Sequence, residues 1–138
     1  MNIETIASEI NELSKEIKSS INSKKDIMEL AINGLDTMYY QHSSGGANGM
    51  KDNTSWLIEE HKNGSVHEPG LVSFLLYLIN KNISINKFLD IGSHYGYWCI
   101  LAANIYKNIL IRGVEINPDS KLTSISNIKL NSFRENII

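Results

Sequence analysis

The chain of 138 residues contains one cysteine and no long hydrophobic run. Cys99 alone cannot form a disulfide within the chain, which fits a reducing compartment. The longest apolar run, residues 71–79, is far shorter than the roughly 20 residues that a membrane-spanning helix needs. The first residues carry acids where a secretory signal would have a basic region. These absences predict a cytoplasmic protein without a membrane partner.

The chain also lacks an excess of positive charge. It has 13 Lys and Arg against 15 Asp and Glu, for a formal net charge of −2. Nucleic-acid binding proteins usually present a basic field, so no nucleic-acid partner is expected. Hydrophobic residues make up 42% of the chain and charged residues 20%, which is typical of a globular domain that can bury a core.

Residues 2–33 are predicted to form an amphipathic helix. Apolar residues from Ile3 to Ile17 recur at spacings of three and four, which places them on one stripe, and the pattern resumes near Ile27 after a polar interruption. Two interpretations follow. The helix packs on its own or a neighbouring domain, or it self-associates through residues 3–31.

The segment that follows predicts a domain boundary. Residues 42–55 have the Gly, Ser and Asn content of a flexible connector. This divides the chain into a helical segment (1–41), a linker (42–55) and a main domain (56–138). Within the main domain, the Asn63-Gly64 pair is typical of a hairpin turn.

The main domain shows alternating helix and strand signals. The predicted elements are a helix over 69–80, a strand over 87–93, a helix over 95–106, a strand over 109–116 and a helix that begins at Pro118. Continuous apolar strand runs are typical of a parallel sheet covered on both faces. Asn117 is placed to cap the last helix, whose inner face is marked by Leu122, Ile125 and Ile128. A possible third strand begins at "NII" near the end of the sequence. The pattern predicts an α/β, Rossmann-like nucleotide-binding fold.

Acidic residues and glycines lie at the carboxyl ends of both predicted strands. A dinucleotide site needs G-x-G-x-x-G, and His94 stands where its second glycine would approach a diphosphate. A nucleoside without phosphates, such as S-adenosylmethionine, fits better. The Glu115 carboxylate can accept both ribose hydroxyls, and Gly92 lets the main chain turn beside the ligand. Asp90 either orders the loop or faces the cationic methionine part, and both roles stay open.

Other chemistry-bearing side chains in this region have simpler interpretations. Tyr97 and Trp98 are predicted to be core residues rather than an adenine platform, although Tyr97 or Tyr95 could also lie at the edge of the pocket. Cys99 is predicted to be a buried packing residue rather than a nucleophile. His61 and His67 match no metal-ligand spacing, so they are expected at surface or hairpin positions and no metal site is predicted.

The segment "FLDIGSHYGYW", followed by "VEINPDSKLTSISNIKLN", resembles motif I and the acidic strand of class I S-adenosylmethionine-dependent methyltransferases, and more narrowly the FkbM family. The resemblance extends to Asn127, Leu130 and Asn131 and to an upstream Glu-Pro pair. It implies a class I methyltransferase fold with S-adenosylmethionine as cofactor. The cofactor-binding residues that it implies are Glu68, Asp90, Gly92, Ser93, Gly96 and Glu115.

The resemblance also implies the reaction, which is O-methylation of a sugar or another small hydroxylated substrate. The family's later Lys-x-Asp-Val-Glu-Gly segment has no counterpart in this sequence. We therefore expect an incomplete catalytic domain, inactive as the 138-residue chain alone, in which no catalytic residue can be named. The alternative is a catalytically silent fragment that assembles through its N-terminal helix.

Overall fold

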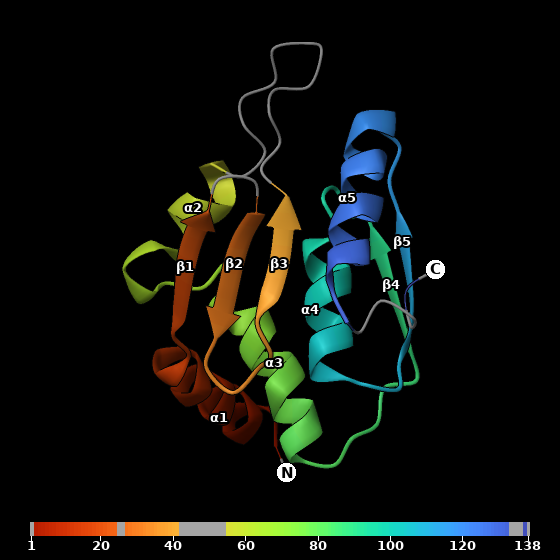
Figure 1. Cartoon of the computed structure of the whole chain (residues 1–138). Coiled ribbons are helices and arrows are strands. Elements are labelled where there is room, and N and C mark those ends of the chain that lie inside the picture. Colours follow the sequence, from red (N-terminus) through yellow and green to blue (C-terminus); the bar gives the residue numbers. More distant parts are fainter. Residues whose placement is uncertain (1, 25–26, 42–54, 133–136, 138) are drawn as a thin grey trace.

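Figure 1 shows the computed structural model, which describes residues 2–24, 27–41, 55–132 and 137. Most of the predicted linker, residues 42–54, therefore lies outside the described residues. The chain is of mixed α/β class, as predicted, with two small sheets. In chain order, the elements are α1 (Ile3–Glu16), β1 (Ser19–Lys24), β2 (Ile27–Ile32), β3 (Met38–Gln41), α2 (Ser55–His61), the 3₁₀ helix η1 (Lys62–Gly64), α3 (Pro69–Asn80), β4 (Lys87–Ile91), α4 (Tyr97–Ile105), β5 (Leu110–Val114) and α5 (Pro118–Leu130). In this described part of the chain, no helix has the length and apolar character needed to cross a membrane.

The prediction of one helix over residues 2–33 is wrong. Helix α1 ends at Glu16, and the three strands that follow form an antiparallel sheet in the order β1-β2-β3. In β2 the buried side chains are those of Met28, Leu30 and Ile32, which alternate with more exposed neighbours. A spacing of two puts these side chains on one face of a strand, whereas in a helix it would scatter them.

Helix α1 packs within its own chain, on α3. The Asn2 side chain caps its start by accepting a hydrogen bond from the Thr5 N–H at 2.9 Å. An ion pair of 2.7 Å joins Glu9 to Lys81 just beyond the end of α3. The apolar stripe of α1 is covered only in part, because Ile6, Ile10 and Leu13 are half-buried and Ile3 is 80% exposed.

The predicted hairpin at Asn63-Gly64 is also wrong. The residues before it form helix α2, and the pair itself lies in η1. Both residues have positive φ, 57° for Asn63 and 81° for Gly64, so this dipeptide reverses the chain after a helix instead of joining two strands. The predicted helix over 69–80 is confirmed, with Pro69 in its first turn.

Strands β4 and β5 are parallel and are connected by α4, as predicted. Helices α4 and α5 lie between this pair and the antiparallel sheet (Figure 1). The outer face of β4 and β5 is exposed, however: Leu89 and Ile91 are 58% and 78% exposed, so the prediction of cover on both faces is not met in the described chain. Ile137 forms a parallel bridge to Ile111 of β5, where the sequence placed a possible third strand.

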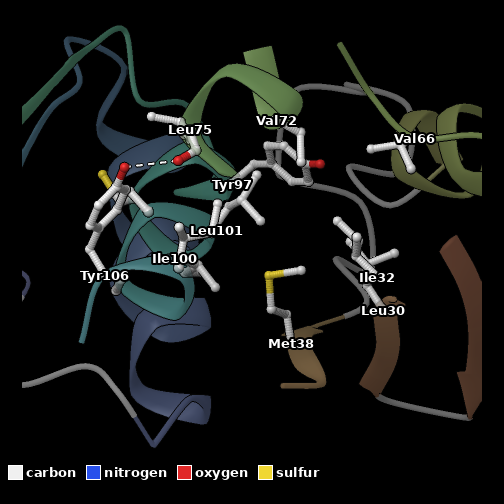
Figure 2. Close-up of a cluster of buried hydrophobic side chains, with 14 of the residues drawn as sticks. Leu30, Ile32, Met38, Val66, Val72, Leu75, Tyr97, Ile100, Leu101 and Tyr106 are labelled. Atoms are coloured by element: carbon white, nitrogen blue, oxygen red, sulfur yellow. Dashed lines mark hydrogen bonds between the residues drawn. The ribbon is translucent and has the colours of Figure 1, made fainter. Parts of the chain in front are cut away.

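One hydrophobic core joins the N-terminal sheet to the α/β unit. Figure 2 shows Leu30 and Met38 of the sheet opposite Ile100 of α4. Tyr106 lies directly after α4, and its hydroxyl donates a 2.8 Å hydrogen bond to the Leu75 carbonyl of α3. This bond joins the end of α4 to α3. Residues 1–41 and 56–138 thus contribute to the same cluster of buried side chains.

The inner face of α5 is polar, contrary to the prediction. Leu122 is 64% exposed and Ile125 is exposed as well, while Ile128 is only partly buried. The capping role of Asn117 is confirmed, because its side chain accepts hydrogen bonds from the N–H groups at the start of the helix. The side chains that α5 and its C-terminal cap bury are those of Ser120, Ser124, Asn127 and Asn131.

Two of these polar residues bind the backbone of β3. The Asn131 amide accepts from the Tyr39 N–H and donates to the Tyr39 carbonyl, both at 3.0 Å, and so takes the place of a neighbouring strand. Asn127 accepts from the Gln41 N–H at 2.9 Å. A polar helix face suits this position, because the edge of a sheet presents unpaired backbone groups that need partners.

Candidate functional site

The loop that follows β4 folds over the end of β5. The N–H groups of Gly92 and Ser93 both donate to the Val114 carbonyl, at 2.8 and 3.0 Å, and the Gly96 N–H closes a turn onto the Ser93 carbonyl at 2.7 Å. Because the strands are parallel, their carboxyl ends lie at the same edge of the sheet. The predicted residues Asp90, Gly92, Ser93 and Glu115 are therefore brought together at this edge.

The two loop glycines have different roles. Gly92 has a φ of +79°, and a Cβ built on it would meet nothing within 4 Å, so open space lies beside its backbone. Gly96 also has a positive φ, of +82°, but a Cβ there would lie 2.7 Å from the Ser124 hydroxyl of α5. Gly92 leaves room for a ligand, while Gly96 lets α5 approach the loop.

Glu115 joins the loop that follows β4 to the residues that follow β5. Its carboxylate accepts a 2.7 Å hydrogen bond from the Asn117 N–H and a 2.8 Å hydrogen bond from the His94 N–H. These bonds, in that order, lower the pKa of Glu115, so the side chain is ionised at neutral pH. A carboxylate can accept about four hydrogen bonds, so the bonds to the backbone leave part of its acceptor capacity for a ligand.

Asp90 lies half-buried beside the same loop. Its carboxylate accepts a 3.4 Å hydrogen bond from the Cys99 thiol. Burial raises the pKa of Asp90, and the charge of Glu115 raises it further. Burial also raises the pKa of the Cys99 thiol, in agreement with its predicted packing role. The loop-ordering role and the cofactor role of Asp90 are both compatible with this position.

Gly113 is a site residue that sequence reasoning missed. It pairs with Asp90 in the sheet register, and a Cβ on it would lie 3.0 Å from both the Ser93 hydroxyl and the Cys99 sulfur. The missed signal was a glycine inside a predicted strand, which often marks a close approach of another group. Its small size lets Ser93 and Cys99 pack directly over β5.

His94 has the backbone conformation that a glycine would adopt most easily, with a φ of +49°. The Glu115 carboxylate accepts its N–H and so helps to hold this conformation. The ring lies against Tyr95, with 3.6 Å between ring centroids, and burial lowers the pKa of His94. The residue that breaks the dinucleotide pattern is thus part of the ordered loop.

A groove of about 300 Å³ lies between β5 and α5 next to this loop. That volume is at the lower end of the range found for small-molecule sites. Of the predicted residues only Ser93 and Glu115 line it, together with Gly113, Val114, Lys121, Ser124, Ile125, Ile128 and Ile137.

Glu68 lies apart from these groups, at the start of α3. Its side chain is exposed, and its carboxylate is 3.9 Å from the His67 ring, which is also 3.1 Å from Glu60. Burial raises the pKa of Tyr97, and the nearby charges of Glu68 and Glu60 raise it further. Glu68 is therefore near the first turn of α4 but makes no contact with Glu115. No group of side chains suited to hold a metal ion occurs in the described ranges.

Tyr97 is a core residue, as predicted, and it lies at the centre of an aromatic cluster. The rings of Trp98, His67, His61 and Trp56 lie 5.2 to 5.8 Å from its ring centroid. The predicted surface position of His61 is wrong, because its side chain is buried and its Nδ1 is 3.0 Å from the Ser19 hydroxyl. Burial lowers the pKa of His61 to about 4, so the ring is neutral at pH 7.

Comparisons with models of protein families, with curated proteins and with solved structures each returned no match for this chain. The geometry at the carboxyl ends of β4 and β5 is therefore what points to a function.

Proposed function

We propose that the carboxyl ends of β4 and β5 bind S-adenosylmethionine, and that the chain contributes the cofactor-binding part of an FkbM-like methyltransferase that acts on a hydroxyl of a small molecule or glycan. One observation carries the proposal. The ionised Glu115 carboxylate, whose bonds to the backbone leave part of its acceptor capacity free, lies in the same loop region as the open space at Gly92. A carboxylate acceptor next to a main chain without a side chain suits the binding of a ribose diol.

The charge of the site supports a ligand without phosphates. Asp90 and Glu115 are close enough for the charge of one to raise the pKa of the other. Two carboxylates at this edge would repel a diphosphate and attract a cation such as a sulfonium or an ammonium group. His94 at its positive φ crowds the position where a dinucleotide-binding loop needs glycine.

The arrangement of strands supports a Rossmann-like fold as part of the same proposal. Ile137 lies next to Ile111 on β5, the second strand of the parallel pair. In the doubly wound order 3-2-1-4-5-6, the third strand also pairs with the second.

The roles of the residues follow from their positions. Glu115 binds the ribose hydroxyls, Gly92 admits the ligand to the main chain, and Ser93 holds the loop over β5. Asp90 supplies negative charge beside the cationic part of the ligand. The cofactor supplies an already electrophilic methyl group, so the protein contributes mainly alignment. No side chain of the described site is assigned as a general base.

Titration calorimetry with S-adenosylmethionine tests the proposal. Glu115→Gln removes charge-assisted hydrogen bonds and should weaken binding roughly 10- to 100-fold. Asp119→Asn is the matched control, because Asp119 is an exposed acid in the first turn of α5, and its affinity should stay that of the unaltered chain. Melting temperatures of both variants show whether the fold is retained. Equal affinities for the two variants, or no binding by the unaltered chain, would contradict the proposal.

A second candidate function is association with another copy of the chain. The exposed outer face of β4 and β5 favours it, because large apolar patches on a surface often mark interaction sites. Sedimentation velocity over a hundredfold range of concentration tests this candidate. A single monomeric species throughout would exclude it.

A further inference from the structure

Three buried polar atoms of the aromatic cluster have no hydrogen-bond partner among the described residues. They are Trp56 Nε1, His61 Nε2 and the Tyr97 hydroxyl. Native proteins pair nearly all buried polar atoms with protein groups or with ordered water, because an unpaired group loses its hydration without compensation. Three such atoms around one ring therefore require an explanation.

Two of the three residues line a small cavity. The cavity has a volume of about 10 Å³ and lies between α2, α4, β3 and α5, with Trp56, Tyr97 and Tyr40 among its lining residues. His61 does not line it. A site of roughly 10–15 Å³ holds a single water molecule when two to four polar partners are present.

Tyr40 provides a further polar partner at this cavity. Its hydroxyl has only a long contact, 3.9 Å, with the Met38 sulfur, which is a weak acceptor. Burial raises the pKa of Tyr40, and the nearby Tyr97 raises it further. The residues that line the cavity thus include one indole, whose N–H can donate, and two tyrosines, whose hydroxyls can donate or accept.

We infer that one structural water molecule is buried in this cavity. It accepts the N–H of Trp56 and forms hydrogen bonds with the hydroxyls of Tyr97 and Tyr40. The volume excludes a larger ligand. Through this water, α2 and β3 are joined to the first residue of α4, directly after the Gly92–Gly96 loop.

Thermal unfolding of Tyr97→Phe gives the first test, because the sign of the effect differs between a wet and a dry cavity. If the water is present, the variant loses a hydrogen bond and its Tm falls. If the cavity is dry, the variant loses an unpaired buried hydroxyl and its Tm rises. Tyr106→Phe is the benchmark, since it removes one direct hydrogen bond, to the Leu75 carbonyl. We expect both variants to melt at lower temperature than the unaltered chain.

Proton NMR on the full chain gives the second test. A long-lived internal water should give a nuclear Overhauser cross-peak between water and the indole N–H of Trp56, with the sign expected for a water that tumbles with the protein. The variant Trp98→Phe leaves one indole and so identifies the signal of Trp56. The inference holds if the cross-peak is present and the Tm of Tyr97→Phe falls. An absent cross-peak, or an unchanged or raised Tm, overturns it.

Discussion

Replacing Asn131 by alanine should destabilise the fold far more than a typical change near a helix end. The Asn131 amide forms three hydrogen bonds, two with the Tyr39 backbone at 3.0 Å and one with the Asn127 carbonyl at 2.8 Å. Its side chain is almost fully buried. Truncation leaves the Tyr39 N–H and carbonyl without partners at the edge of β3. Each unpaired buried group costs about 1–3 kcal/mol, and partial access to water reduces this, so we expect a loss of about 2–4 kcal/mol.

Urea denaturation followed by circular dichroism measures the free energy of unfolding. The expected loss is a large share of the roughly 5–15 kcal/mol that stabilises a small domain. Asn11→Ala is the matched control, because Asn11 lies exposed on α1 and the same substitution there should change stability by less than about 0.5 kcal/mol. If Asn131→Ala and the control are equally stable, the amide does not serve as a substitute strand for β3.

Three further predictions concern the site and its support. Gly96→Ala should lower the Tm, because the residue has a positive φ and its new Cβ would meet the Ser124 hydroxyl; a Tm equal to that of the unaltered chain would show that the loop relaxes freely. The free energy of unfolding should decrease as the pH is lowered from about 6.5 to about 4. The pKa of His61 in the folded chain lies below its value in the unfolded chain, so the unfolded state binds the proton first. The Tm difference between the unaltered chain and His61→Gln, measured across this range, should shrink as the pH falls. Cys99 should react with a thiol reagent only after unfolding, since burial raises its pKa and hides the sulfur; rapid reaction of the folded chain would contradict this.

The sequence predicted the parallel strand pair and its helices well, and the physical reason is local. Pro69 and Pro118 each begin a helix, and the apolar runs that became β4 and β5 are short and bounded by polar residues. The predicted residues Asp90 and Glu115 meet because the carboxyl ends of parallel strands share one edge. These features depend on neighbours in the chain and can be recognised without tertiary contacts.

The N-terminal sheet could have been recognised from a different period. Met28, Leu30 and Ile32 alternate with more exposed residues, but Ile27 and Ala31 also fit a helical spacing of four. In so short a segment, apolar residues can fit both the helical spacing of three or four and the strand spacing of two. Because the residues before this segment are helical, the helical period continues past the end of α1.

The polar face of α5 could not be predicted from apolar spacing. Leu122 and Ile125 mark a stripe that the fold leaves exposed, while Asn127 and Asn131 face inward. A helix can bury amides where they find hydrogen-bond partners, and here the unpaired backbone groups at a strand edge supply them. That neighbour, β3, lies far away in the sequence, so its demand for partners cannot be seen locally.

The aromatic cluster gives the protein a built-in optical probe. The chain has two tryptophans, and both lie within it: Trp56 is 5.1 Å and Trp98 is 6.1 Å from the His67 ring, measured between centroids. All indole emission therefore originates beside the first turn of α4, next to the Gly92–Gly96 loop. Emission intensity should then follow events at this end of the molecule without any attached dye, and it should be insensitive to changes around α1.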